Sequence, residues 1–164
     1  MRALTVQQPW ASAIIHAGKT IENRSQRWEY RGPVAIHAGQ LWSDKGENST
    51  VLRKAFQELV PQWNGGKLPR WAFPMGAFIG VVDLVDVHRA CGCCAPWGEP
   101  GISYAEPGER HPRQTVHLVL ENPRYLAEPI PCRGALGLWT PQVAHMRQMQ
   151  AAVPRDSSTR TGRL

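Results

Sequence analysis

The sequence has no apolar run that approaches the roughly 20 residues needed for a membrane-spanning helix. Its N-terminus, Met1 to Gln8, also lacks the hydrophobic segment of a signal peptide. We therefore expect a cytoplasmic protein without a membrane partner. In that compartment the four cysteines are expected to be reduced thiols rather than a disulfide framework.

Motifs of several enzyme classes are missing as well. The chain contains no glycine-rich phosphate loop of the P-loop or dinucleotide-binding type, and it has no internal repeats. Thr20 or Ser25 beside Lys19 is the nearest approach to an activated nucleophile, and hydroxyl residues are too common for this to weigh much. The sequence therefore favours a binding protein over an enzyme and predicts no cofactor.

The 164 residues that are present suit one folded domain, because 42% are hydrophobic and only 20% are charged. Seven Trp against three Phe and three Tyr is an unusual balance, and the indole suits both cores and surfaces that stack on bases. The formal charge is +6, of which the tail 154–164 supplies +2. This excess fits a polyanionic partner without establishing one.

The hydrophobic pattern predicts mostly short strands, separated by turn signals, and few helices. This arrangement indicates an α+β fold, a small mixed β-barrel with helices packed at its ends. Expected strands are 3–6, 20–24, 34–38, 76–88, 115–120 and 135–139, and expected helices are 10–17, 51–60 and 141–151. Residues 89–113 read as a long loop of the kind that is often functional.

Four separated parts of the chain carry a family resemblance. They are 4–11 (LTVQQPWA), 18–25 (GKTIENRS), 30–38 (YRGPVAIHA) and 131–139 (PCRGALGLW). In this order they resemble the ASCH (activating signal cointegrator homology) domain over residues 2–141. We accordingly assign residues 1–145 to this domain and 146–164 to a helix end and a disordered, Arg-bearing tail.

The resemblance implies a PUA-like fold with a cleft floored by the strand that carries Lys19, Glu22 and Arg24. It also implies binding of RNA, of single-stranded nucleic acid or of a nucleotide, including a modified one. Some relatives are similar to ribonucleases or to amidohydrolases acting on acetylated cytidine. Those amidohydrolases carry a threonine nucleophile where this chain has Glu22, and many relatives have Trp where it has Gln26.

Lys19, Glu22 and Arg24 fall within six positions. Glu22 and Arg24 point to the same side of a strand, and Lys19 at its start can reach that side. A carboxylate held between two cations stays ionised and can accept from the exocyclic amine of a base. The alternative is an ion-pair network that only shapes the structure.

Gln8 and Trp10 lie where the first helix is expected to start. The free N–H groups there suit an anion, and the Trp10 ring suits a base. In the alternative interpretation, Gln8 is a helix cap and Trp10 anchors the core.

Arg27, Trp28, Tyr30 and Arg31 interleave basic and aromatic side chains, as sites for single-stranded nucleic acid do. A solvated turn is the alternative. His37, at the end of the next strand, is a candidate ligand or acid–base group, or else a satisfied histidine at a barrel end.

The cysteines allow a zinc hypothesis. Cys91 and Cys94 form one Cys-x2-Cys pair, and Cys132 with His88 or His111 would complete four ligands. The spacing is irregular for a zinc knuckle, so a reducible disulfide and plain thiols remain alternatives.

The main prediction is nucleic-acid binding through the cleft. One alternative is a hydrolase in which Lys19 and Glu22 are catalytic. The other is a protein-interaction module of the transcriptional coregulator type.

Overall fold

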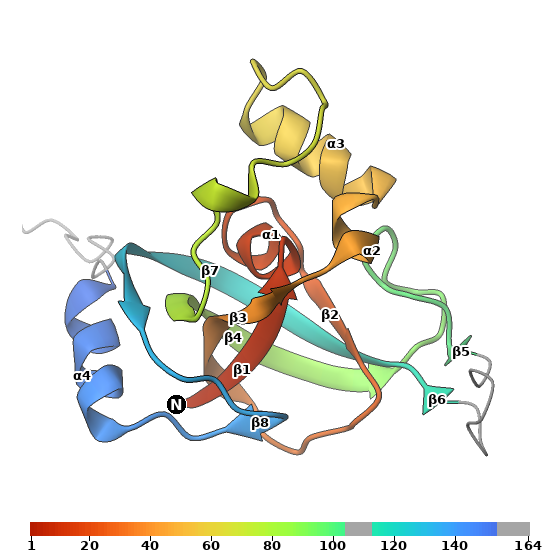
Figure 1. Cartoon of the computed structure of the whole chain (residues 1–164). Helices are drawn as coiled ribbons and strands as arrows, with labels where there is room; N and C mark the ends of the chain where they lie inside the picture. The colour runs from red at the N-terminus through yellow and green to blue at the C-terminus, as the bar shows by residue number, and fades with distance from the viewer. Residues whose placement is uncertain (104–112, 154–164) are drawn as a thin grey trace, which may run out of the picture.

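The computed structural model describes residues 1–103 and 113–153, in which strands predominate and the helices are short (Figure 1). The strands are β1 (Arg2–Gln8), β2 (Ile21–Arg24), β3 (Gly32–Trp42), β4 (Ala77–Arg89), β5 (Ile102–Ser103), β6 (Arg113–Gln114), β7 (Val116–Pro131) and β8 (Leu138–Trp139). The helices are α1 (Trp10–His16), α2 (Asp44–Glu47), α3 (Thr50–Leu59), a 3-10 turn (Arg70–Ala72) and α4 (Val143–Ala152). The predicted tail 154–164 and candidate ligand His111 lie outside the described residues.

Six strands form one sheet in the order β2-β7-β4-β3-β1-β8, while β5 and β6 pair separately. The β1–β3 pair is parallel, and the other pairs are antiparallel. The sheet curls into a half-barrel, with α1, α2 and α3 gathered at one end and α4 at its side (Figure 1). The predicted α+β fold is thus confirmed.

Both faces of the sheet are covered. Successive residues of a strand point to opposite faces, and in the central strands successive residues are apolar, so each face packs in a core. Leu4 and Ile36 join the larger core inside the curl, where α1 adds Ile14. Their neighbours Ala3 and Ala35 point to the opposite face and pack in a second core with Phe78, Leu126 and the buried Met149 of α4. None of the described helices is long and apolar enough to cross a membrane.

Several element boundaries differ from the sequence prediction. The largest difference is in the strand expected over 115–120, which continues as β7 through Asn122-Pro123 to Pro131. The register with β4 shifts there, from Asp83 opposite Glu121 to Val81 opposite Arg124. Such a bulge removes the proline from the hydrogen-bonded ladder, so the missing N–H does not break the strand.

Candidate nucleic-acid interface

The predicted Lys19–Glu22–Arg24 cluster exists and is largely buried. Lys19 Nζ lies 2.9 Å from Glu22 Oε2, and Arg24 Nη2 lies 3.0 Å from Glu22 Oε1. Gly18 adopts a left-handed φ of 68° just after α1, which turns the chain towards β2 and brings Lys19 beside Glu22. The exposed fractions of Lys19 and Glu22 are only 4% and 8%.

Both cations make further contacts within the protein. Lys19 also donates to the backbone carbonyl of Ile21 and lies 5.6 Å from the Trp10 ring centroid. Arg24 Nη2 donates to the carbonyl of Thr5 at 2.8 Å. These contacts fix the positions of the two cations, so the carboxylate between them is held in one place.

The charges around Glu22 decide its protonation. Burial alone would raise the pKa of this carboxyl, but Lys19 and Arg24 outweigh that effect and hold the pKa below its ordinary value. Each carboxylate oxygen has one cation partner, whereas an ionised carboxylate has about four acceptor positions. Glu22 therefore keeps acceptor capacity for a further N–H donor.

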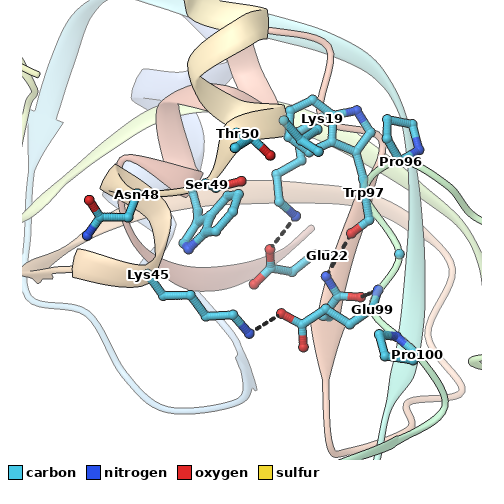
Figure 2. Close-up of a pocket in the computed structure, with 14 residues that line it drawn as sticks. Lys19, Glu22, Lys45, Asn48, Ser49, Thr50, Pro96, Trp97, Glu99 and Pro100 are labelled. Carbon is cyan, nitrogen blue, oxygen red and sulfur yellow. Dashed lines mark hydrogen bonds and ion pairs between the residues drawn. The ribbon is translucent and has the colours of Figure 1, made fainter. Parts of the chain in front are cut away.

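Glu22 lies in the wall of a cavity of about 660 Å³, a volume within the roughly 300–1,000 Å³ of small-molecule sites. Figure 2 shows Lys19 reaching Glu22 there, with Trp97 beside them. The lining residues come from α1, β2, the α2–α3 region and the loop after β4: Trp10, Lys19, Glu22, Asn23, Lys45, Asn48, Ser49, Thr50, Val51, Pro96, Trp97, Gly98, Glu99 and Pro100.

The loop after β4 supplies a wall that sequence reasoning did not assign to the site. Asn23 donates to the carbonyl of Trp97 and accepts from the N–H of Glu99, both at 2.9 Å. Lys45 Nζ pairs with Glu99 Oε1 at 2.5 Å, joining α2 to the loop across the cavity (Figure 2). The only sequence signal was the length of the predicted 89–113 loop.

A second hollow of about 420 Å³ adjoins the first. Trp10, Glu22 and Asn23 line both, so the two hollows meet at Glu22. The second also contains Arg24 and Leu136, whose exposed fraction is 98%. Together the two hollows make a groove, which we call the Glu22 groove.

Of the two candidates at the start of α1, only Trp10 lines the groove. Gln8 is fully buried, accepts from Ser12 N–H at 3.0 Å and donates to the Pro74 carbonyl at 2.9 Å. This is the cap arrangement, and it occupies a helix N–H that an anion would need. Trp10 donates to Ser43 Oγ at 3.1 Å while its ring lines both hollows.

None of the four candidates in the basic and aromatic turn lines either hollow, although Trp28 lies next to Gly137 in the wall of the second. Arg31 donates to the carbonyls of Trp28 and Tyr30, at 3.0 and 2.9 Å. Trp28 and Tyr30 pack against the larger core, and Arg27 is exposed. The turn is thus held both by its own hydrogen bonds and by packing on the core.

His37 does not line either hollow of the Glu22 groove. It is buried, donates from Nε2 to the Cys132 carbonyl at 3.1 Å, and lines a neighbouring hollow that shares Thr5 and Leu136 with the second one. Burial lowers the pKa of this imidazole, and the hydrogen bond to Cys132 opposes the shift. His37 is accordingly a neutral histidine at neutral pH.

The four cysteines do not lie together in one site. Contrary to the expectation of four reduced thiols, a disulfide joins Cys91 to Cys93. Cys132 packs against the second core and is not in the potential metal-ligand cluster found among the described residues. That cluster contains His88 and Cys94, as predicted, but with Cys93 and His117 instead of Cys91 and Cys132.

The comparison with protein families decides the relationship. The model of the ASCH domain matches residues 4–128, well over half of the chain. The chain belongs to the ASCH domain family. Among curated proteins, none matches it significantly.

Solved ASCH structures share the fold. The crystal structure of ASCH from Zymomonas mobilis is 11% identical with a TM-score of 0.56, and the match covers 94% of this chain and 96% of that one. A tyrosine-to-phenylalanine mutant of that protein is 11% identical with a TM-score of 0.53, and the match covers 93% of this chain and 98% of that one. A serine-to-alanine mutant of the same protein is 12% identical with a TM-score of 0.52, and the match covers 93% of this chain and 96% of that one. At this identity the likeness establishes the PUA-like fold alone.

Proposed function

We propose that this ASCH domain binds RNA or single-stranded DNA by taking one nucleotide into the Glu22 groove. The observation that carries the proposal is the ionised, buried carboxylate of Glu22 in the wall of a cavity large enough for a nucleotide. Glu22 lines both hollows of the groove, so its carboxylate lies where a nucleotide would be held.

The groove has the chemistry for each part of a nucleotide. Glu22 is an acceptor only, so it favours a base with an exocyclic amine, as carboxylates accept from cytosine N4. The indoles of Trp10 and Trp97 line the cavity and offer faces for stacking. Arg24 and Lys45 line the groove paired with Glu22 and Glu99, and phosphates would bind there by sharing these cations with the two carboxylates.

The contacts of Lys19 give the hydrolase alternative no specific support. Its ammonium is paired with Glu22 and bonded to the Ile21 carbonyl, so it is not a free base. Thr20 is exposed and, like Ser25, does not line either hollow. We therefore propose binding rather than turnover.

Titration of labelled single-stranded oligonucleotides tests the proposal. Oligo-C and oligo-A are expected to bind more tightly than oligo-U, because cytosine and adenine present an exocyclic amine to Glu22 and uracil does not. The logarithm of affinity should fall with the logarithm of salt concentration, with a slope of about 0.7 for each phosphate contact. Equal affinity for all three homopolymers would contradict the assigned role of Glu22.

Two substitutions locate the binding in the groove. Trp97→Ala should weaken binding by roughly 5- to 150-fold, equivalent to about 1–3 kcal/mol for one stacked base. Glu22→Gln should weaken the preference for amino bases, because the amide can donate as well as accept. The matched controls are Trp71→Ala, a Trp 90% exposed and outside the groove, and the exposed Glu29→Gln. Unchanged binding in correctly folded Trp97→Ala and Glu22→Gln would overturn the proposal.

A further inference from the structure

Two histidines and two cysteines meet beside the groove. His88 on β4 and His117 on β7 are register partners, and Cys93 and Cys94 come from the loop that follows β4. One ligand atom from each of the four lies within 4.8 Å of the others. His88 Nε2 is 3.5 Å from Cys93 Sγ and 3.4 Å from Cys94 Sγ, and the two sulfurs are 3.6 Å apart.

These separations match the edges of a tetrahedron around zinc. With Zn–S bonds of about 2.3 Å and Zn–N bonds of about 2.0–2.1 Å, tetrahedral angles place two sulfurs roughly 3.8 Å apart and a sulfur and a nitrogen roughly 3.5 Å apart. The three observed separations fall within about 0.2 Å of those edges.

The protons on the two imidazoles point away from the centre of the cluster. His88 Nδ1 is 2.8 Å from Asp86 Oδ2, and His117 Nε2 is 2.9 Å from the Glu99 carbonyl. Because both oxygens only accept, each of these nitrogens carries the proton and the other nitrogen keeps its lone pair. A carboxylate or carbonyl behind each histidine is the usual arrangement around a bound metal.

His117 provides the second, independent observation. Its side chain is fully buried, and its Nδ1 has no hydrogen-bond partner among the described residues. A buried polar atom without a partner costs free energy, so it calls for an explanation such as a bound ion. A metal at the cluster would use this lone pair.

We propose that His88 Nε2, Cys93 Sγ, Cys94 Sγ and His117 Nδ1 bind one Zn²⁺ in a tetrahedral site. Mixed thiolate and imidazole ligands suit this metal, and four protein ligands leave no open position, which makes the site structural rather than catalytic. The proposal does not depend on what occupies the Glu22 groove.

The disulfide between Cys91 and Cys93 makes the site dependent on redox state, because thiolates are the ligands of zinc. A dithiol reductant transfers two electrons and two protons to the Cys91–Cys93 bond and is itself oxidised to a disulfide. Both cysteines become thiols. Zinc binding then releases one proton each from Cys93 and Cys94. Cys91 is thus the residue that competes with the metal for Cys93.

The metal would fix the wall of the Glu22 groove. Gly98 N–H donates to the Cys94 carbonyl at 2.6 Å, and a Cβ at Gly98 would lie 2.7 Å from both Cys94 Cβ and His117 Cε1. The segment that carries Trp97 and Glu99 is therefore packed directly on two of the four ligands.

Cobalt and zinc titrations of the full chain test the site. After reduction with a phosphine in the absence of oxygen, Co²⁺ should give the visible absorption of a tetrahedral thiolate complex, one equivalent per chain, and Zn²⁺ should displace it. Oxidised protein should bind at least tenfold more weakly. Absence of the tetrahedral spectrum in reduced, folded protein would overturn the proposal.

Single substitutions test the ligand set. Cys93→Ser, Cys94→Ser and the partly exposed His88→Ala should each abolish the cobalt spectrum, while Cys132→Ser, the matched control, should leave it unchanged. Cys91→Ser should bind cobalt without any reductant. If Cys91→Ser abolishes binding while Cys93→Ser retains it, the assigned set is wrong. Circular dichroism of each variant separates loss of the metal from loss of the fold.

Discussion

Two polar clusters lie next to each other on the sheet and are satisfied in opposite ways. In the first, Glu22 is neutralised within the protein by Lys19 and Arg24. In the second, His88 and His117 bond their protons to oxygens and leave lone pairs facing two sulfurs. In the first cluster each carboxylate oxygen has a cation partner within the protein, whereas in the second His88 Nε2 and the unpartnered His117 Nδ1 keep lone pairs that the proposed metal would use.

The largest expected effect comes from breaking the first cluster. Glu22→Leu leaves Lys19 buried without a counter-charge and removes the main partner of Arg24, so the free energy of unfolding should fall by about 3–5 kcal/mol. Urea unfolding measures the loss. The exposed Glu29→Gln should stay within about 0.5 kcal/mol of the wild type. A loss below about 1 kcal/mol in Glu22→Leu would show that the ion pairs do not hold this region.

Acid should remove the same contribution gradually. Because the folded-state pKa of Glu22 lies below its ordinary value of 4.5, its contribution to stability is complete above about pH 4.5 and is lost as the pH falls through the folded-state value. The difference in unfolding free energy between wild type and Glu22→Gln should therefore be constant near neutral pH and shrink on acidification. A difference that grows in acid would contradict the direction of the shift.

The second cluster is best examined through the residue behind a ligand. Asp86 accepts from His88 Nδ1 at 2.8 Å, so Asp86→Asn should lower cobalt affinity by about 10- to 100-fold while keeping the tetrahedral spectrum. Asp86 also forms an ion pair with Arg31, in which Oδ1 lies 3.6 Å from Arg31 Nη2. Arg31→Gln removes that ion pair and the Arg31 hydrogen bonds to the Trp28 and Tyr30 carbonyls, but it leaves the Asp86–His88 contact in place, so cobalt affinity should be unchanged. Equal effects of both substitutions would place the role of Asp86 in the ion pair instead.

Local sequence was sufficient for most of the elements and for the first cluster, although the short α2 and the β5–β6 pair were not predicted. Ala3 to Val6 predicted β1, and Gly18 marked the end of α1. Lys19 and Glu22 are three positions apart, so their ion pair depends only on the local conformation of the chain between them. Asn122-Pro123 misled the prediction because a proline is excluded only from a regular ladder, and β7 is bulged there.

The metal-ligand cluster could not be obtained in this way. His88 and His117 are far apart in the sequence and face each other only because β4 and β7 pair in one register. The sequence favoured Cys132 as a ligand on residue type alone, but the fold places it beside His37. The wall around Trp97 likewise depends on Asn23 of β2, which no motif connects to that loop.

Short stretches of the chain were therefore enough for the ASCH resemblance, the strand and helix pattern and the charged cluster of β2, because each depends on residues close together in sequence. Folding was needed to choose the loop that walls the Glu22 groove, to separate the basic turn at 27–31 from it, and to select the two cysteines that stand with His88 and His117. Strand register and loop packing bring distant residues together through many weak contacts, and no short segment encodes those contacts.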